Sequence, residues 1–360
     1  MDGARLRKAI RSALTYLRGP GARELERIRT LRRYIRQYEV EHREIYLQCK
    51  AKRTLVERPC PICSAKASDF FLRNTTGAEY RVCRECDLVF MSPILDHDSL
   101  ERVYTMHQTG AKKTFWRYLM DDAPKLSEPP EVPPYEIRLL KQFRDGGRLL
   151  DFGCSYGGFL NVARFYFDAV GVEIDPITSR FARDELGLRV LTKDIFDPSL
   201  ESENAFDIIT MRQVIEHLED PRAVVNRLRS CLRRDGCIFI ECPNSKSYSM
   251  RILGKHHALV LGNEHVNLFS LESMEKLLRE CGFEVLHAET YKLDLALYDI
   301  LGLWLAPIRH FHHRYSFRNS FTMRVLSYPD VLFRRAVLRK MADDKGFGSY
   351  LRVVAGKRQG

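Results

Sequence analysis

Residues 148–291 alternate between short apolar runs and amphipathic stretches. Strands are expected at the apolar runs 148–153, 169–175, 188–192, 206–211, 237–243 and 283–291, and helices at 159–167, 176–186, 220–232 and 271–281. Strands that alternate with helices in this way favour a parallel sheet covered on both faces. A last strand-like run begins at Tyr350, so residues 293–348 are expected to form an insertion before the closing strand.

The pattern before the sheet region is helical. Residues 5–17 carry an apolar stripe among basic residues, and Gly19-Pro20-Gly21 interrupts it. A second helix is expected over residues 22–47, with a seam that steps by three and four through Ile28, Leu31, Ile35, Tyr38, His42 and Ile45. Such a seam fits a helix that pairs with a second copy in a homodimer, and it fits equally a helix packed on its own domain.

These patterns divide the chain into four regions. Residues 1–58 form a basic helical arm, 59–95 a cysteine-bearing module, 96–135 a linker or cap rich in proline and acid, and 136–360 the sheet domain. The 360 residues are 45% hydrophobic and 29% charged, which predicts a packed core. The net charge of +11 is uneven, because residues 1–58 carry 16 Lys and Arg against 7 Asp and Glu, whereas 59–308 carry 30 against 37. The positive field therefore belongs to the ends of the chain.

The sequence contains no secretory signal and no apolar run of about 20 residues that would span a bilayer. The chain is therefore expected in the cytoplasm. Its basic ends raise the hypothesis of peripheral contact with the inner face of the membrane. For residues 293–308, a lid over the substrate is the preferred alternative.

Four cysteines form two CxxC knuckles. They are Cys60, Cys63, Cys83 and Cys86, with 19 residues between the knuckles. A two-residue gap lets both thiolates of a knuckle turn toward one ion, and four thiolates complete the tetrahedral shell of a structural zinc. A zinc ribbon is therefore expected at residues 59–95, and a redox or adventitious cluster is the alternative. The cysteines of the sheet region are expected in the core.

The stretch LLDFGCSYGGFL, from Leu149 to Leu160, places three glycines between a strand and a helix. Glycines at this point let backbone amides approach a ligand closely. The loop lacks the GK[ST] of a phosphate-binding P-loop and does not match G-x-G-x-x-G. Asp151 places a negative charge where a pyrophosphate would lie, so a cationic ligand is favoured instead.

Two further acids follow the next strands. Glu173 comes 22 residues after Asp151, where an acid binds the hydroxyls of a ribose. Asp194 follows the third strand, where it can meet an exocyclic amine. A ribose, an adenine amine and a ligand ammonium group together describe S-adenosylmethionine.

The blocks LLDFGCSYGG, VGVEIDP, KDIF, FDIITMRQVIEHLEDP and GCIFIECPN resemble the class I S-adenosylmethionine-dependent methyltransferases, over residues 136–292 and 350–357. The resemblance implies a Rossmann-like, doubly wound, seven-stranded α/β sheet. It also implies contacts to the cofactor: Asp151, Gly153, Ser155 and Gly157 near the methionine end, Glu173 and Ile174 at the ribose, Asp194 and Ile195 at the adenine, and Gln213 beside the methyl group. Ser155 stands where many members have glycine.

The acceptor is expected to carry a hydroxyl group. The fourth strand lacks the Asn/Asp-Pro-Pro-aromatic and Pro-Cys motifs of nucleobase methyltransferases, which disfavours nucleic acid. His265, with Glu264, lies in GNEHVNLFS and is the candidate base, while His217 in QVIEHLEDP is interpreted as mainly structural. The segment resembles the Tyr-x-Glu-His-x-x-Tyr-x-Ser loop of zinc-containing sugar C-methyltransferases. Gly262 replaces its first tyrosine, which favours transfer to oxygen over carbon.

The sequence therefore predicts methyl transfer to a hydroxyl, less readily to a carbon, of a sugar or glycan-type small molecule. Two alternatives remain. An RNA methyltransferase would use the basic ends to bind phosphates, and a non-catalytic scaffold would bind the cofactor without transferring its methyl group.

Overall fold

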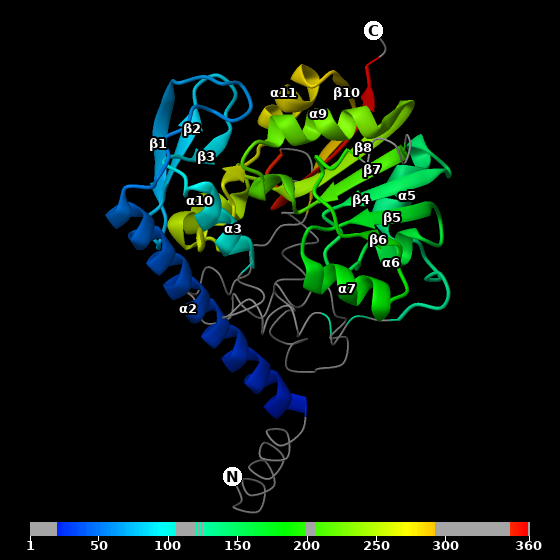
Figure 1. The fold of residues 1–360 in the computed structure, drawn as a ribbon, viewed down its shortest axis with the longest axis horizontal. Helices are drawn as coiled ribbons and strands as arrows, with labels where there is room; N and C mark the ends of the chain where they lie inside the picture. Colours follow the sequence, from blue (N-terminus) through cyan, green and yellow to red (C-terminus); the bar gives the residue numbers. More distant parts are fainter. Residues whose placement is uncertain are drawn as a thin grey trace, which may run out of the picture.

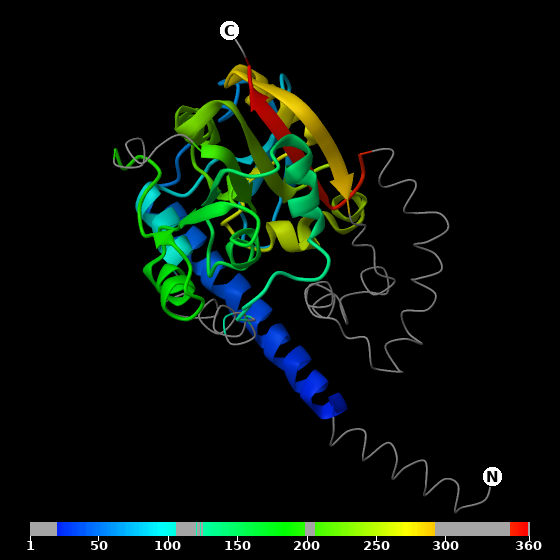
Figure 2. The same ribbon diagram turned by 90° about the vertical axis from the view of Figure 1, so that its right-hand side faces the viewer.

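The computed structural model describes residues 20–105, 120, 123, 125–198, 206–291 and 346–358. Its largest sheet has seven strands in the order β10-β11-β8-β7-β4-β5-β6. These are β4 (Arg148–Phe152), β5 (Asp168–Val172), β6 (Val190–Leu191), β7 (Phe206–Arg212), β8 (Leu232–Pro243), β10 (Phe283–Tyr291) and β11 (Tyr350–Lys357). Only β11 runs antiparallel to its neighbours in this sheet, β8 and β10, which lie on either side of it (Figure 2). The predicted seven-stranded doubly wound sheet is confirmed.

Helices cover both faces of this sheet (Figure 1). Leu149 and Ile208 pack into one core with α5 (Tyr135–Phe143), α6 (Leu160–Ala163) and α7 (Pro176–Asp184). Leu150 and Ile209, the next residues along the same strands, pack into the other core with α9 (Pro221–Cys231) and α11 (Leu271–Glu280). Successive side chains of a strand point to opposite faces. The continuous apolar runs of the sequence are therefore what a sheet buried on both sides requires.

Aspartate-proline pairs start two of the helices. The Asp175 side chain accepts hydrogen bonds from the backbone N–H groups of Ile177 and Thr178, and Pro176 occupies the first turn of α7. Asp220 and Pro221 begin α9 in the same way. The carboxylate satisfies amides that have no partner within the helix, and proline needs no such partner. Both helices therefore begin directly after loops at the carboxyl edge of the sheet.

Several predicted boundaries are wrong, and three of them concern the sheet and its connections. The helix expected at 159–167 is only the four-residue α6, because β5 begins at Asp168 and the chain turns through residues 164–167 to reach it. β6 has two residues instead of five and lies at the edge of the sheet, where it pairs with β5 alone. β8 begins at Leu232 instead of Cys237, since it follows α9 without an intervening loop.

A second, four-stranded sheet joins the ribbon to the sheet domain. Its order is β1-β2-β3-β9, with β1 (Ser68–Arg73), β2 (Glu79–Cys83), β3 (Val89–Met91) and β9 (Asn267–Leu268). β9 comes from the segment between β8 and α11, and its residues Asn267 and Leu268 pair with Phe90 and Val89 of β3. The ribbon sheet is thus completed by the loop that carries the candidate base. The region expected as a linker, 96–135, contains the helix α3 (His97–Thr105).

The long helix α2 (Pro20–Lys52) begins at the predicted break and leads from beside the ribbon away from the rest of the molecule (Figure 1). Three positions of its seam, Tyr38, His42 and Ile45, are buried against this same chain. Ile45 packs in one core with Tyr80, Leu100 and other residues of the ribbon side. This part of α2 is therefore packed on its own domain. A homodimer through residues 22–47 stays a prediction, and these three side chains are not available to it.

The remaining segments bear on the membrane hypothesis. Among the described helices, none combines the length and the apolar character needed to cross a bilayer. Residues 1–19 of the arm, and residues 293–345 of the expected insertion, lie outside the described part of the chain.

Candidate functional site

The predicted cofactor residues come together at the carboxyl edge of four neighbouring strands. β7, β4, β5 and β6 are adjacent and parallel, so the loops that follow them lie side by side. These loops carry every predicted cofactor contact: Asp151, Gly153, Ser155, Gly157, Glu173, Ile174, Asp194, Ile195 and Gln213. In an open α/β sheet, this edge is where ligands bind.

Asp151 is a buried acid at the end of β4. Its side chain accepts a 2.8 Å hydrogen bond from Thr210 Oγ1 of the neighbouring strand β7. Burial raises the pKa of Asp151 to about 6, although the Thr210 hydrogen bond and the positive charge of Arg212 act in the opposite direction. A carboxylate in such a position gains from a cationic ligand that replaces the lost hydration.

The loop after β4 needs its glycines. Gly153 and Gly157 have φ angles of +70° and +85°, and a Cβ atom at either would lie within 2.5 Å of the side chain of Val214 or Leu188. Ser155 adopts φ +53°, a left-handed conformation that glycine adopts at lower cost. The backbone at Ser155 therefore has the left-handed conformation that a glycine would adopt at this position.

Glu173, at the end of β5, is held by two backbone amides. Ser155 N donates to its Oε2 and Asp175 N donates to its Oε1, each at 2.8 Å. Burial raises the pKa of Glu173, while these amide hydrogen bonds act to lower it. A carboxylate oxygen has two acceptor positions, so each oxygen keeps one for a ribose hydroxyl.

The other predicted cofactor residues differ in accessibility. Asp194 is exposed and accepts a 2.7 Å hydrogen bond from Phe196 N, which fixes its carboxylate at the surface. Ile174 is also exposed, whereas the side chain of Ile195 is buried in the core, so Ile195 presents only its backbone to a ligand. Gln213 has φ +56°, and its N–H donates to the Glu241 carbonyl of β8 at 2.7 Å.

His217 and His265, the two candidate bases, lie together. Their ring centroids are 4.6 Å apart. His217 Nδ1 lies 3.0 Å from the backbone oxygen of Glu264, and His265 Nδ1 lies 2.8 Å from that of Leu259. Glu264 thus contributes its backbone to His217, and its side chain is half-buried. His217, which the sequence indicates to be mainly structural, therefore lies beside His265, the candidate base.

The analysis of the sequence missed Glu216, the residue before His217. It lies on the short 3-10 helix η2 (Ile215–His217) and is buried. Burial raises the pKa of Glu216 to about 8, and the nearby acids Glu241 and Glu264 act in the same direction. One ligand atom from each of Glu216, His217 and His265 lies within 4.8 Å of the other two. The only signal in the sequence was the Glu-His pair of the EHL motif.

Arg58 is the second residue that the sequence did not reveal. It precedes the ribbon, and its Nε donates to Met91 O at 3.0 Å. Its Nη2 donates to Val266 O at 2.8 Å and to Asn267 Oδ1 at 3.0 Å, where the chain enters β9. Its Nη1 donates to Glu219 O at 3.0 Å, beside the EHL motif. One guanidinium group therefore connects the ribbon with both histidine-bearing segments.

The ribbon and α2 hold the His265 segment at further points. Tyr80 of β2 donates its hydroxyl hydrogen to His265 O at 2.8 Å. Asn263 N donates to His42 Nδ1 of α2 at 2.9 Å, and Asn263 Nδ2 donates to His42 O at 2.7 Å. A Cβ on Gly262 would lie 2.2 Å from the hydroxyl oxygen of Tyr38, so this position has no room for a tyrosine.

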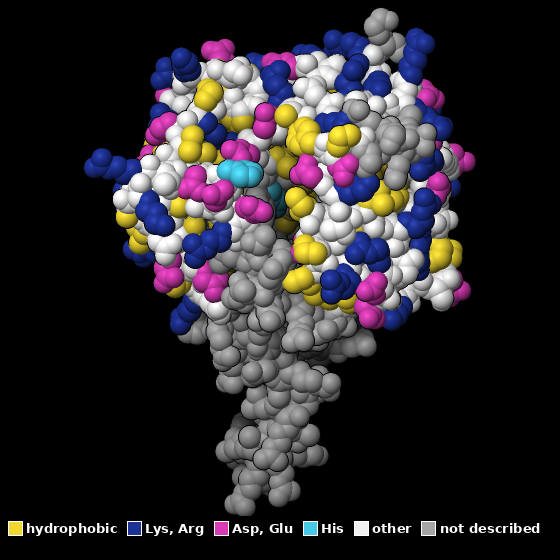
Figure 3. Space-filling view, viewed as in Figure 1, with side chains coloured by type: hydrophobic (Ala, Val, Ile, Leu, Met, Phe, Trp, Pro, Cys, Tyr) yellow, Lys and Arg dark blue, Asp and Glu magenta, His cyan; other side chains and the backbone are white. Residues whose placement is uncertain are grey.

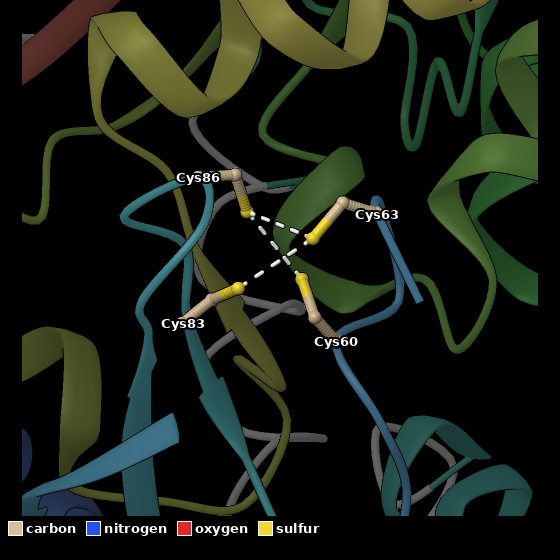
Figure 4. A group of neighbouring side chains, drawn as sticks. All are labelled: Cys60, Cys63, Cys83 and Cys86. Carbon is tan, nitrogen blue, oxygen red and sulfur yellow. Dashed lines mark hydrogen bonds between the residues drawn. The ribbon is translucent and has the colours of Figure 1, made fainter. Parts of the chain in front are cut away.

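The four predicted zinc ligands converge (Figure 4). The Sγ atoms of Cys60 and Cys86, and those of Cys63 and Cys83, are 3.5 Å apart, and those of Cys63 and Cys86 are 3.6 Å apart. Thiolates bound tetrahedrally to one zinc ion at about 2.3 Å lie roughly 3.8 Å apart. The donor set and its spacing therefore fit zinc. The other predicted core cysteines, Cys154, Cys231, Cys237, Cys242 and Cys281, are buried.

The surface is hollowed between the ribbon side and the sheet side of the molecule (Figure 3). Acidic side chains and a histidine lie at the rim, and apolar side chains lie deeper.

Comparisons with known proteins agree with this geometry. The family model described as "Methyltransferase domain" matches residues 132–288. Phosphoethanolamine N-methyltransferase 3 of Arabidopsis thaliana is 27% identical over 154 residues, which cover 41% of this chain and 30% of that protein. The ubiquinone biosynthesis O-methyltransferase of Bordetella avium is 30% identical over 125 residues, which cover 32% of this chain and 52% of that protein. The chain thus spans about half or less of the length of these two relatives.

A solved S-adenosylmethionine-dependent methyltransferase from Archaeoglobus fulgidus is 20% identical, with a TM-score of 0.39 over 61% of this chain and 90% of the other. The match of the family model coincides with the part of the sheet whose loops carry the acids and glycines described above. Residues 132–288 therefore form a domain that matches the methyltransferase family, with the fold that the resemblance to class I S-adenosylmethionine-dependent methyltransferases predicts.

Proposed function

We propose that the protein is a methyltransferase that uses S-adenosylmethionine and acts on a hydroxyl group of a sugar or glycan-type small molecule. The observation that carries the proposal is the convergence of Asp151, Glu173 and Asp194 on adjacent loops, next to the pair His217 and His265. The family of the domain supports the cofactor.

The residues of the sheet edge fit the parts of this cofactor. Asp151 would face the positively charged methionine end, Glu173 would accept hydrogen bonds from the ribose hydroxyls, and Asp194 would accept one from the adenine amine. Gly153 and Gly157 give the loop its positive φ angles, at positions where a Cβ atom would overlap Val214 or Leu188. When bound, S-adenosylmethionine supplies a methyl group on a positively charged sulfur, which an acceptor oxygen can attack.

The acceptor side contains groups that can take up a proton. The carbonyl of Leu259 is an acceptor, so His265 Nδ1 carries the hydrogen and Nε2 is the basic nitrogen. His265 accepts the hydroxyl proton as the methyl group arrives, with His217 as the second imidazole. The O-methyltransferase relatives support transfer to oxygen, whereas the Arabidopsis relative is named for transfer to nitrogen.

The choice of a sugar rests on the His265 segment and its ribbon. The segment resembles the loop of sugar methyltransferases that also contain zinc, and Gly262 in place of the first tyrosine favours oxygen over carbon. Cys60, Cys63, Cys83 and Cys86 would hold a zinc ion with a closed coordination shell. Zinc would then stabilise β3, and through its pairing with β9 it would support the segment that carries His265.

Two measurements test the proposal. Calorimetry with S-adenosylmethionine and with its demethylated product should register binding that Asp151→Asn abolishes, and no binding to the wild-type protein would overturn the assignment. Mass spectrometry of glycans from cells with and without the gene should reveal a species that lacks one methyl group. An RNA substrate would instead produce an affinity that falls steeply with salt.

A further inference from the structure

The Glu216 carboxylate is buried without a hydrogen bond. Its residue is 1% exposed, and neither Oε1 nor Oε2 has a hydrogen-bond partner in the described part of the chain. Buried polar groups are nearly always hydrogen-bonded or bound to an ion, because desolvation is otherwise costly. A protonated carboxyl would still leave its hydroxyl without an acceptor. Glu216 therefore points to a ligand that the described residues do not supply.

His217 and His265 are oriented as metal ligands are. Each has Nδ1 within hydrogen-bond distance of a backbone carbonyl, which fixes the hydrogen on Nδ1 and makes Nε2 the nitrogen with the lone pair. Metal-bound histidines usually donate their second nitrogen to a carbonyl or carboxylate, which sets the ring orientation. A carboxylate oxygen of Glu216 and one nitrogen of each ring lie within 4.8 Å of one another.

We propose that Glu216, His217 and His265 form a second metal site, for a divalent transition metal. Ligands at about 2.1 Å from one ion lie roughly 3–3.6 Å apart, which small side-chain rotations reach from the observed spacing. Two imidazoles and one carboxylate suit zinc, iron or manganese, whereas magnesium and calcium prefer oxygen ligands alone. Three protein ligands, unlike the four cysteines, leave a coordination position open.

The open position lies on the acceptor side of the domain. Glu216 and His217 follow β7, and His265 precedes β9, so the site joins the sheet edge to the segment held by the ribbon. An acceptor oxygen can take the open position. This use of the site rests on the proposed function, whereas metal binding does not. When a metal is bound at this site, His265 is a ligand and does not act as the base. His265 acts as the base only in protein without a metal at this site.

Metal analysis of the full-length protein tests the inference. Protein loaded with zinc and then desalted should contain one equivalent more than the four cysteines hold, and Glu216→Gln and His265→Gln should each lose that equivalent. His256→Gln, which alters an exposed histidine, should retain it. Manganese should occupy the same site and be lost with the same two variants.

Two checks keep the test decisive. Circular dichroism and binding of the demethylated cofactor should be unchanged in Glu216→Gln, which excludes misfolding as the cause of a lost ion. Equal metal content in the wild type and in folded Glu216→Gln would overturn the site. That result would not affect the proposed methyl transfer. Conversely, failure of the wild-type protein to bind the cofactor would contradict the proposed function and would leave the measured metal content unchanged.

Discussion

The backbone N–H of Ser155 donates a 2.8 Å hydrogen bond to Glu173 Oε2. This bond ties the loop after β4 to the acid after β5, so the two predicted parts of the cofactor site form one unit before any ligand binds. The left-handed conformation of Ser155 directs its N–H toward the acid. A preorganised site of this kind loses less freedom when the cofactor binds.

Glu173→Gln should weaken binding of the demethylated cofactor by about 10- to 100-fold. The amide has a single acceptor oxygen and no charge, and hydrogen bonds to charged groups contribute about 1.5–3 kcal/mol. Isothermal titration calorimetry measures the loss. Glu185→Gln, at an exposed glutamate that pairs with Lys125 at the surface, is the matched control. Equal affinity of both variants would contradict the ribose role.

Asp151→Asn should abolish cofactor binding and stabilise the protein at neutral pH. The folded pKa of Asp151 is about 6, above its ordinary 3.8, so the folded state binds the proton more tightly than the unfolded state. Stability is therefore lost as pH rises from about 4 to 6, by roughly 3 kcal/mol in all. Asparagine does not titrate and can still accept the Thr210 hydrogen bond.

Urea unfolding at pH 4 and pH 7.5 measures this effect. The free energy of unfolding of Asp151→Asn should exceed that of the wild type at pH 7.5 and approach it at pH 4. Asp194→Asn, which changes an exposed acid of the same site, should leave stability unchanged at both pH values. A destabilised Asp151→Asn protein at pH 7.5 would contradict the desolvation argument.

The sheet, and the meeting of the candidate cofactor residues at its edge, were predictable because their signals are local. Strand periodicity, the glycines after β4 and an acid after each of the next two strands all lie within short stretches of sequence. β10 matches the predicted strand 283–291 at both ends. The short α6 could not be predicted, because its end is set by where β5 must begin.

The acceptor side was predictable only in part. His265 stands out in its motif, but its neighbours come from distant segments: Arg58 precedes the ribbon, and Tyr38 lies on α2. No local pattern records that Asn267 pairs with β3. The buried state of Glu216 depends equally on packing from other parts of the chain. Such contacts are tertiary and leave no periodic trace in the sequence.

Gly262→Ala should destabilise the protein by about 1–3 kcal/mol, the usual cost of overpacking a close contact. The added Cβ would overlap the buried Tyr38 side chain. Gly146→Ala is the control, because a Cβ there meets nothing within 4 Å. Adding Tyr38→Ala to Gly262→Ala should cancel the overlap in a double-mutant cycle. Chemical denaturation measures all four proteins, and an additive cycle would contradict the contact.

Arg58→Ala should lower turnover by about 100-fold, since small displacements of a catalytic group cost that much, and should leave cofactor affinity unchanged. Four hydrogen bonds of its guanidinium group go to the ribbon and to the segments beside His217 and His265. Arg58→Lys should restore little, because lysine lacks the planar fork. Arg36→Ala, at an exposed position of α2, is the control. Equal turnover of Arg58→Ala and the control would exclude the positioning role.

Cys86→Ser should remove one zinc ion and reduce turnover more than cofactor binding. Cys83 ends β2 and Cys86 lies just before β3, so loss of the ion loosens the strand that pairs with β9. The cofactor loops lie on the other sheet and should retain their affinity.

Cys281→Ser is the matched control, because it changes a buried cysteine outside the tetrad and should keep the full zinc content. Emission spectrometry of purified protein counts the ions. If the two metal sites are independent, the losses in Cys86→Ser and Glu216→Gln add, and the double variant binds no zinc. If the double variant retained as much zinc as one of the single variants, the second substitution would have removed no ion. The site altered by that substitution would then not hold zinc.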